Sequence, residues 1–140
     1  MTAHELLAIQ IEDAGYQIMQ AVSGLDEAGM DYRPTPAGLT PRETLVHLTE
    51  AYVALGKTLK GERHEWGSYS MPDSSTSKVL ETWLQVREET VKLAMERTEA
   101  ADLSQVHAFV IAHDYYHVGQ LVQTRLAHDP SWDSYTIYRF

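Results

Sequence analysis

The sequence predicts an all-α protein: a four-helix bundle with long loops and an aromatic C-terminal tail packed on the bundle. Four segments of about 20 residues repeat apolar side chains at intervals of three and four, as one face of a helix does. No strand-like alternation competes with them, and turn-forming residues separate them. Four helices of about 30 Å match in length as an antiparallel bundle. We expect residues 1–140 to form a single domain.

The first expected helix begins at Thr2 and ends near Gly24. Thr2 and Glu5 have the spacing of a capping box, in which each side chain bonds the backbone N–H of the other residue. Glycine is common just beyond a helix C-terminus, as Gly24 would be. The buried stripe of this first helix comprises Leu7, Ile11, Ala14, Ile18, Ala21 and Leu25.

The second expected helix begins after a connection, residues 25–39, that is interrupted by glycine and proline. Thr40 can cap this helix, Pro41 suits its first position and Glu43 can bond back to the cap. The helix ends near Gly61. Its apolar face comprises Leu45, Leu48, Tyr52, Leu55 and Leu59.

The third expected helix follows a polar, turn-rich loop at residues 61–76 and runs from about Ser77 to about Thr98. Asp102 and Ser104 can cap the fourth helix, which continues to about Leu126. The tail after it is too aromatic to remain in water, so we expect it to fold back over the bundle.

Composition excludes several classes of function. The formal net charge is −9, with 11 basic against 20 acidic residues and no basic run. Nucleic-acid binding depends on Lys and Arg facing phosphates, so we exclude it as the main activity. No apolar stretch approaches the roughly 20 residues of a membrane span, and the first residues do not resemble a signal peptide. Cysteine is absent, which excludes disulfides and thiolate ligands, and we expect a cytoplasmic protein.

His113 and His117 are the most informative residues for function. They are four apart on one helix, so their imidazoles share a face. His47, on the second helix, could supply a third ring, and three neutral nitrogens are a common ligand set for an open divalent-metal site. On a helical wheel the pair lies within an apolar stripe, with Val106, Val110, Leu121 and Thr124.

An alternative is that these are core-edge histidines with ordinary hydrogen bonds, because short motifs often match by chance. His47 lies at the flank of its apolar face beside Ala51 and Ala54, whose small side chains suit either a cavity or a close helix contact. The three rings can reach one height only if the helices are offset along their axes. Spacing alone leaves both interpretations open. The histidines that we expect not to be ligands are His4, His64, His107 and His128.

Glu50 and Gln120 each follow a candidate ligand by about one turn. Either could hydrogen-bond an imidazole N–H or a metal-bound water, which would fix the ring orientation. Glu50 lies further from the apolar centre than His47 does, which favours a solvated carboxylate. Asp114 is turned away from the histidine stripe on the wheel, which predicts a surface charge.

These residues also carry a resemblance to a known family. The strongest element is the segment HDYYHVGQL at residues 113–121, followed by Arg125; further matches are Tyr32-Arg33-Pro34, Thr40-Pro41-Arg42-Glu43 and Val46-His47-Leu48. Together they resemble the DinB-like (DNA-damage-inducible, YfiT-like) superfamily of metalloenzymes. The resemblance implies a four-helix bundle with a metal held by His47, His113 and His117 plus water. Characterised relatives include transferases and isomerases that use low-molecular-weight thiols.

The function we expect is that of a divalent-metal-dependent enzyme, either a thiol-dependent transferase or a hydrolase, acting on a small-molecule substrate. Imidazole ligands suit zinc or nickel. Without cysteine, any thiol must arrive as a cosubstrate. The alternatives are a non-catalytic metal-binding or interaction module, which predicts no pocket beside the metal, and a purely structural bundle. A second apolar stripe on the fourth helix, from Ile111 to Leu126, predicts a homodimer.

Overall fold

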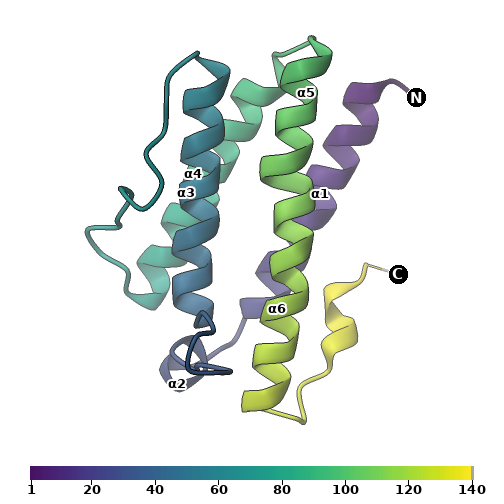
Figure 1. Cartoon of the computed structure of the whole chain (residues 1–140). Helices are drawn as coiled ribbons and strands as arrows, with labels where there is room; N and C mark the ends of the chain where they lie inside the picture. Colours follow the sequence, from purple (N-terminus) through teal and green to yellow (C-terminus); the bar gives the residue numbers. More distant parts are fainter. Residues whose placement is uncertain (140) are drawn as a thin grey trace.

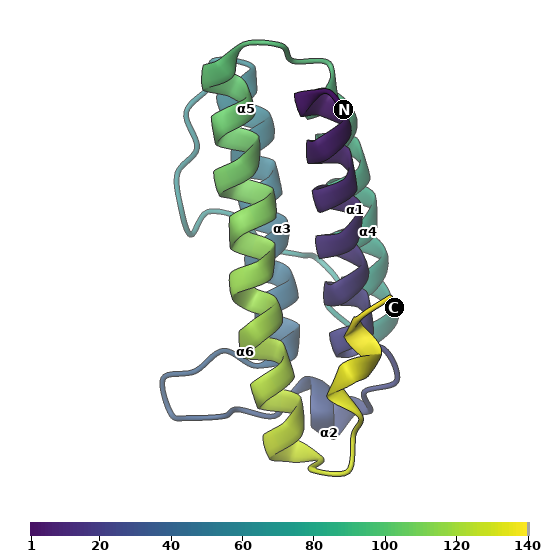
Figure 2. The same cartoon turned by 90° about the vertical axis from the view of Figure 1, so that its right-hand side faces the viewer.

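The computed structural model describes residues 1–139, all of whose regular elements are helical, which confirms the predicted all-α fold. Four long rods stand side by side (Figures 1 and 2). The first three are α1 (Ala3–Val22), α3 (Pro41–Leu59) and α4 (Thr76–Met95); the fourth is continuous through α5 (Ala100–Val106), the π-helix η1 (His107–Ala112) and α6 (His113–His128). Two short elements, α2 (Glu27–Met30) and the 3₁₀ helix η2 (Ser134–Ile137), lie outside the rods.

The helix starts predicted at Thr2 and Thr40 are confirmed. The Thr2 hydroxyl accepts from the backbone N–H of Glu5 at 3.1 Å, and the Glu5 carboxylate accepts from the N–H of Thr2 at 2.6 Å. Thr40 caps α3 by accepting from the N–H of Glu43 at 3.1 Å. Gly24, just beyond α1, has a φ of 79°, a left-handed conformation that suits glycine.

Other local features differ from the prediction. The fourth rod begins at Ala100, so Asp102 and Ser104 lie inside its first turns and do not cap it. The connection before α3 contains α2, whose first turn is capped by Asp26 through the N–H of Gly29 at 2.7 Å. The π-helical segment η1 is wider than an α-helix, so a wheel drawn with α-helical geometry loses its phase there.

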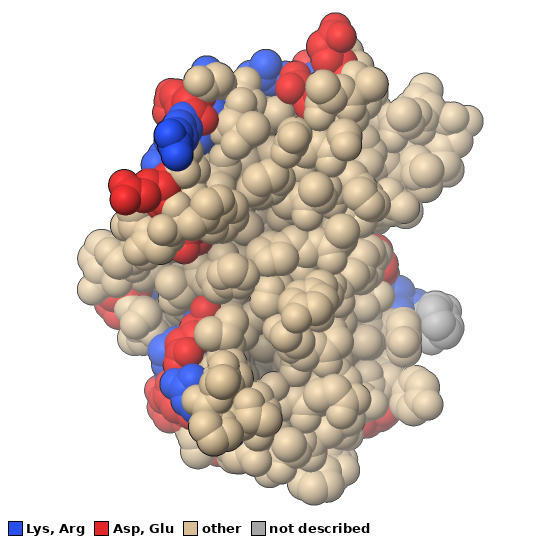
Figure 3. Space-filling model, in the orientation of Figure 1, with Lys and Arg blue, Asp and Glu red and all other residues tan. Residues whose placement is uncertain are grey.

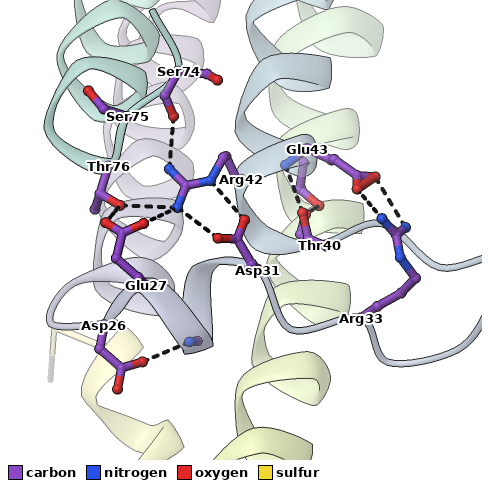
Figure 4. A network of polar contacts seen from close by, with 12 residues as sticks. Asp26, Glu27, Asp31, Arg33, Thr40, Arg42, Glu43, Ser74, Ser75 and Thr76 are labelled. Carbon is purple, nitrogen blue, oxygen red and sulfur yellow. Dashed lines mark hydrogen bonds and ion pairs between the residues drawn. The ribbon is translucent and has the colours of Figure 1, made fainter.

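Arg42, in the first turn of α3, joins three parts of the chain (Figure 4). Its guanidinium donates to Glu27, the first residue of α2, at 2.7 Å and to Asp31, just after α2, at 2.9 Å. It also donates to the carbonyl of Ser74 at 2.8 Å, just before α4. Arg33 pairs nearby with Glu43. Arg33 and Arg42, which carry part of the family resemblance, therefore hold together the end of the bundle at which α3 begins. Neither belongs to the three-histidine cluster.

A buried polar network links α1, α3, α4 and α6 through Asp114, which is 0 % exposed. Its carboxylate accepts from the Tyr52 hydroxyl at 2.6 Å and from Arg87 at 2.8 Å. Arg87 also donates to the carbonyl of Ile11 at 2.7 Å, and Gly15 leaves room for it, because a Cβ there would lie 2.6 Å from the guanidinium. The prediction that Asp114 is a surface charge is wrong, since partners on two other helices hold it inside the bundle.

The second apolar stripe of the fourth rod faces α1, the helix on which α6 packs most extensively. Ile111 and Val118 are buried in the core, and the Tyr115 hydroxyl donates to Asp13 of α1 at 2.5 Å. The fold thus accounts for much of this stripe within one chain. Homodimerisation stays a prediction.

The tail after α6 returns along the bundle, as predicted. The guanidinium of Arg125 lies 4.4 Å from the centroid of the Trp132 ring, and Ile137 is buried in the core. Arg125 also donates to the carbonyl of Ser23 at 2.7 Å, which satisfies an open carbonyl at the end of α1. Within residues 1–139, no helix combines the length and the apolar character that crossing a membrane requires.

We predict that Asp114→Ala lowers the free energy of unfolding by about 3–5 kcal/mol, because it leaves the Arg87 charge buried without its partner. Urea unfolding followed by circular dichroism measures this loss. Glu88→Ala, which removes an exposed carboxylate next to Arg87, is the control and should change stability by less than about 0.5 kcal/mol. A loss below about 1 kcal/mol for Asp114→Ala would show that the network does not hold the bundle together.

Candidate metal centre

The imidazole rings of His47, His113 and His117 meet in one cluster. The Nε2 atom of His113 lies 3.0 Å from Nε2 of His47 and 3.0 Å from Nε2 of His117. One nitrogen from each ring lies within 4.8 Å of the other two, and the three ring planes meet nearly edge to face. His47 comes from α3, whereas the other two come from the first turns of α6.

The axial offset that this meeting requires is present. The α5–η1–α6 rod extends beyond the beginning of α3 at the lower end of the bundle in Figure 1. His47, two turns into α3, can therefore lie level with the start of α6. The hydrogen bond from Tyr52 to Asp114 joins the same two rods next to His113 and fixes this alignment.

The residues present fit a divalent ion. Zinc–imidazole bonds are about 2.0–2.1 Å, so two nitrogens on one ion are separated by about 3.0–3.4 Å, and the two Nε2 pairs that include His113 have such a separation. Three imidazole lone pairs directed at one point repel one another unless a cation or protons lie between them. Nδ1 of His117 is buried without a hydrogen-bond partner of good geometry, so this ring lacks the outer partner that usually orients a ligand.

The surroundings keep two of the rings in the neutral form that binds metal. The pKa of His117 is lowered from 6.5 to about 4, first by burial and then by the charges that His113 and His47 would carry. Burial, followed by the neighbouring His47, also lowers the pKa of His113. Protons therefore compete with a metal for these two rings only at acidic pH.

A cavity of about 200 Å³ opens directly on this cluster, with His113 forming part of its wall. Ala51 on α3 lies in another wall, as expected from the small side chains beside His47. The remaining walls come from η1, through Ala108 and Phe109, and from Trp66 in the loop between α3 and α4. The π-helical segment thus contributes to the cavity and leads directly into His113, the first residue of α6. Such segments are frequent at functional sites.

The sequence patterns did not point to Trp66 and Phe109 as residues that line the cavity. Their rings are nearly parallel, at an angle of 13° with centroids 6.1 Å apart. Phe109 fell on neither apolar stripe of the wheel. For Trp66 a signal was available, since a tryptophan in a polar, turn-rich loop is a large apolar group with no core to enter.

Glu50 organises the loop that carries Trp66. Its carboxylate accepts from Nε2–H of His64 at 2.9 Å and from the N–H of Gly67 at 2.7 Å. Burial raises its pKa, but hydrogen bonds from His64, Gly67 and Tyr69 outweigh burial and bring the pKa below its ordinary value. Glu50 is only 8 % exposed, so the prediction of a solvated carboxylate is wrong. The loop folds back and covers it.

Gln120 lies on the exposed side of α6, where its amide donates to the Tyr116 hydroxyl at 3.0 Å. Gln120 raises the pKa of His117, against the larger lowering by burial and by the other two histidines, so it lies beside that ligand candidate. The Tyr116 ring meets the His117 ring edge to face at 5.0 Å. This pair therefore borders the cluster from the side of solvent.

The surroundings of the cluster carry little charge. Among residues 1–139, no carboxylate lies close enough to join the three histidines as a ligand. In Figure 3 the centre of the face formed by α3 and α6 is largely uncharged, and acidic and basic side chains gather along its left and upper margins. A divalent ion at the cluster would therefore keep its full charge available to a bound molecule.

The helical bundle with its three-histidine cluster is compatible with a metal-binding protein. Comparison with known families agrees with this class. The chain matches the family model of the DinB superfamily over residues 10–121, and it belongs to that superfamily. The matched part includes all three histidines. Comparisons with curated proteins and with solved structures give no significant match.

We predict that the metal-free protein loses stability as the pH falls from about 6.5 to about 4. The unfolded chain takes up a proton at His117 near pH 6.5, whereas the folded chain resists protonation down to about pH 4. The stability contributed above pH 6.5 is thus lost over this interval, by up to about 3 kcal/mol. Thermal unfolding between pH 4 and pH 8 measures it. His117→Leu should flatten the curve, and parallel curves for the parent and variant would contradict the assignment.

We also predict that Glu50→Ala releases the loop of residues 61–75. Hydrogen bonds to a charged group stabilise by about 1.5–3 kcal/mol, so the amide of Gly67 should exchange at least about tenfold faster. Hydrogen–deuterium exchange measures this rate. Glu62→Ala, which removes an exposed carboxylate of the same loop, is the control. Unchanged exchange in Glu50→Ala would show that other contacts hold the loop.

Proposed function

We propose that this protein is a divalent-metal-dependent enzyme that acts on a small molecule, as a thiol-dependent transferase or a hydrolase. The observation that carries the proposal is the cavity that opens on His113. A site that only stores or senses a metal has no need of such a space, whereas an enzyme needs room for a substrate beside the ligands. The non-catalytic alternative is therefore the weaker one.

The histidine cluster supports this chemistry because its three imidazoles are neutral and because His113 faces the cavity. His47, His113 and His117 would hold the ion as neutral ligands and leave its charge uncompensated. When bound, a divalent ion supplies a Lewis acid that lowers the pKa of water or of a thiol. Zinc and nickel are the ions that this donor set suits.

The chain itself supplies positioning and exclusion of water. Trp66 and Phe109 cover one side of the cavity, and Ala51 leaves space against α3. Cysteine is absent from the sequence, so in the transferase reaction the thiol enters as a cosubstrate. The absence of a carboxylate from the cluster leaves no side-chain general base among the ligands, which favours a nucleophile activated by the ion.

We predict that the untagged protein, purified without chelator, carries about one zinc or nickel ion per chain, and that His113→Ala carries less than about a tenth of that. The reason is that two remaining imidazoles hold a divalent ion far less tightly than three. Elemental analysis by inductively coupled plasma mass spectrometry measures the content. His107→Ala is the matched control, because His107 is an exposed histidine of the same rod outside the cluster.

Equal and negligible metal in the parent and in His113→Ala, also after incubation with zinc or nickel, would contradict the proposal. If metal is present, a panel of electrophiles with and without small thiols separates the two reaction types. Turnover only with a thiol identifies a transferase, and turnover in water alone identifies a hydrolase. No turnover of any kind with the fully loaded protein would favour the non-catalytic module.

A further inference from the structure

The cavity beside His113 also restricts the kind of substrate. Resting on the proposed function, we propose that it is a subsite for one uncharged aromatic ring of the substrate, with Trp66 as the main determinant of specificity. The ring would lie against Trp66 and Phe109, and the reacting group attached to it would reach the histidine cluster.

The volume suits a single ring. The cavity encloses about 200 Å³. An apolar protein cavity of about 150 Å³ is sufficient to bind benzene. The space beside His113 can therefore take a six-membered ring with a small substituent. A nucleotide or another extended cofactor is larger than this space and would extend out of its open side.

The lining suits an apolar, planar group. Ala51 and Ala108 contribute methyl groups, Trp66 and Phe109 contribute aromatic rings, and His113 is the only lining residue that can ionise. Aromatic rings attract one another in offset and edge-to-face arrangements. Among residues 1–139, no lysine or arginine lines the cavity, so a phosphate or carboxylate placed there would lose its hydration without gaining a partner.

Trp66 is held in position although it is still 55 % exposed. The next residue, Gly67, donates its N–H to Glu50, and the nearby His64 ring meets the Trp66 indole edge to face at 5.1 Å. A fixed backbone with an uncovered indole is the arrangement expected of a residue that covers a ligand. Several other apolar side chains of this chain are exposed as well; Trp66 differs from Ile9 and Tyr135 in lining a cavity whose wall includes His113.

Three probes test the subsite on zinc-loaded protein. Acetohydroxamate can bind the metal but has no ring, fluorobenzene has a ring but no metal-binding group, and benzohydroxamate has both. We expect benzohydroxamate to bind at least about tenfold more tightly than acetohydroxamate by isothermal titration calorimetry. We expect fluorobenzene to bind weakly and saturably by ¹⁹F NMR.

Two variants assign the effect to the cavity. Trp66→Ala should reduce the ratio of the two hydroxamate affinities to below about threefold and leave the affinity for acetohydroxamate unchanged. Ala108→Leu, which adds bulk at an exposed wall residue of the cavity, should abolish saturable binding of fluorobenzene. Tyr135→Ala is the control, since Tyr135 is an exposed aromatic residue on η2, at the opposite side of the bundle from the Trp66 loop (Figure 1).

The outcomes separate this inference from the proposed function. Equal affinity for the two hydroxamates, or a preference that survives in Trp66→Ala, overturns the aromatic subsite and leaves the metal site standing. Absence of saturable fluorobenzene binding overturns it as well. Failure of both hydroxamates to bind, with fluorobenzene still bound, supports the ring subsite and contradicts the metal-dependent activity.

Discussion

The alignment of α3 with the α5–η1–α6 rod is the constraint on which the rest of the site depends. Asp114 follows His113 directly and accepts a hydrogen bond from Tyr52, which lies five residues after His47. A shift of either helix by one turn would break this bond and separate the imidazoles. Because Asp114 is also tied to Arg87 of α4, the alignment is fixed from a third helix. The buried network thus holds the three histidines level with one another.

The parts of the fold that depend on local chemistry could be predicted from the sequence. The caps at Thr2 and Thr40 depend on side chains within three residues, and the apolar stripes depend on helical periodicity. Features that depend on distant partners could not. Asp114 looked like a surface charge because nothing near it in the sequence points to Tyr52 or Arg87. The π-helical segment also left no local signal.

The candidate site divides in the same way. The convergence of His113 and His117 follows from their spacing, whereas the approach of His47 required the helix offset that the structure supplies. The cavity could be foreseen only in part, from the small side chain of Ala51. Its cover could not be, because Trp66 is positioned by a carboxylate 16 residues earlier that holds the next residue in the loop. The same loop supplies Trp66 to the wall of the cavity beside His113.

A crystal structure of the metal-loaded protein tests the three-histidine metal site most directly. Anomalous diffraction data collected at the absorption edge of the metal locate the ion. We expect one strong anomalous peak about 2.0–2.2 Å from Nε2 of His47, His113 and His117. The remaining side of the ion should be open to the cavity. A peak at other residues, or three imidazoles that turn away from one another and bond only to protein groups, would contradict this metal site.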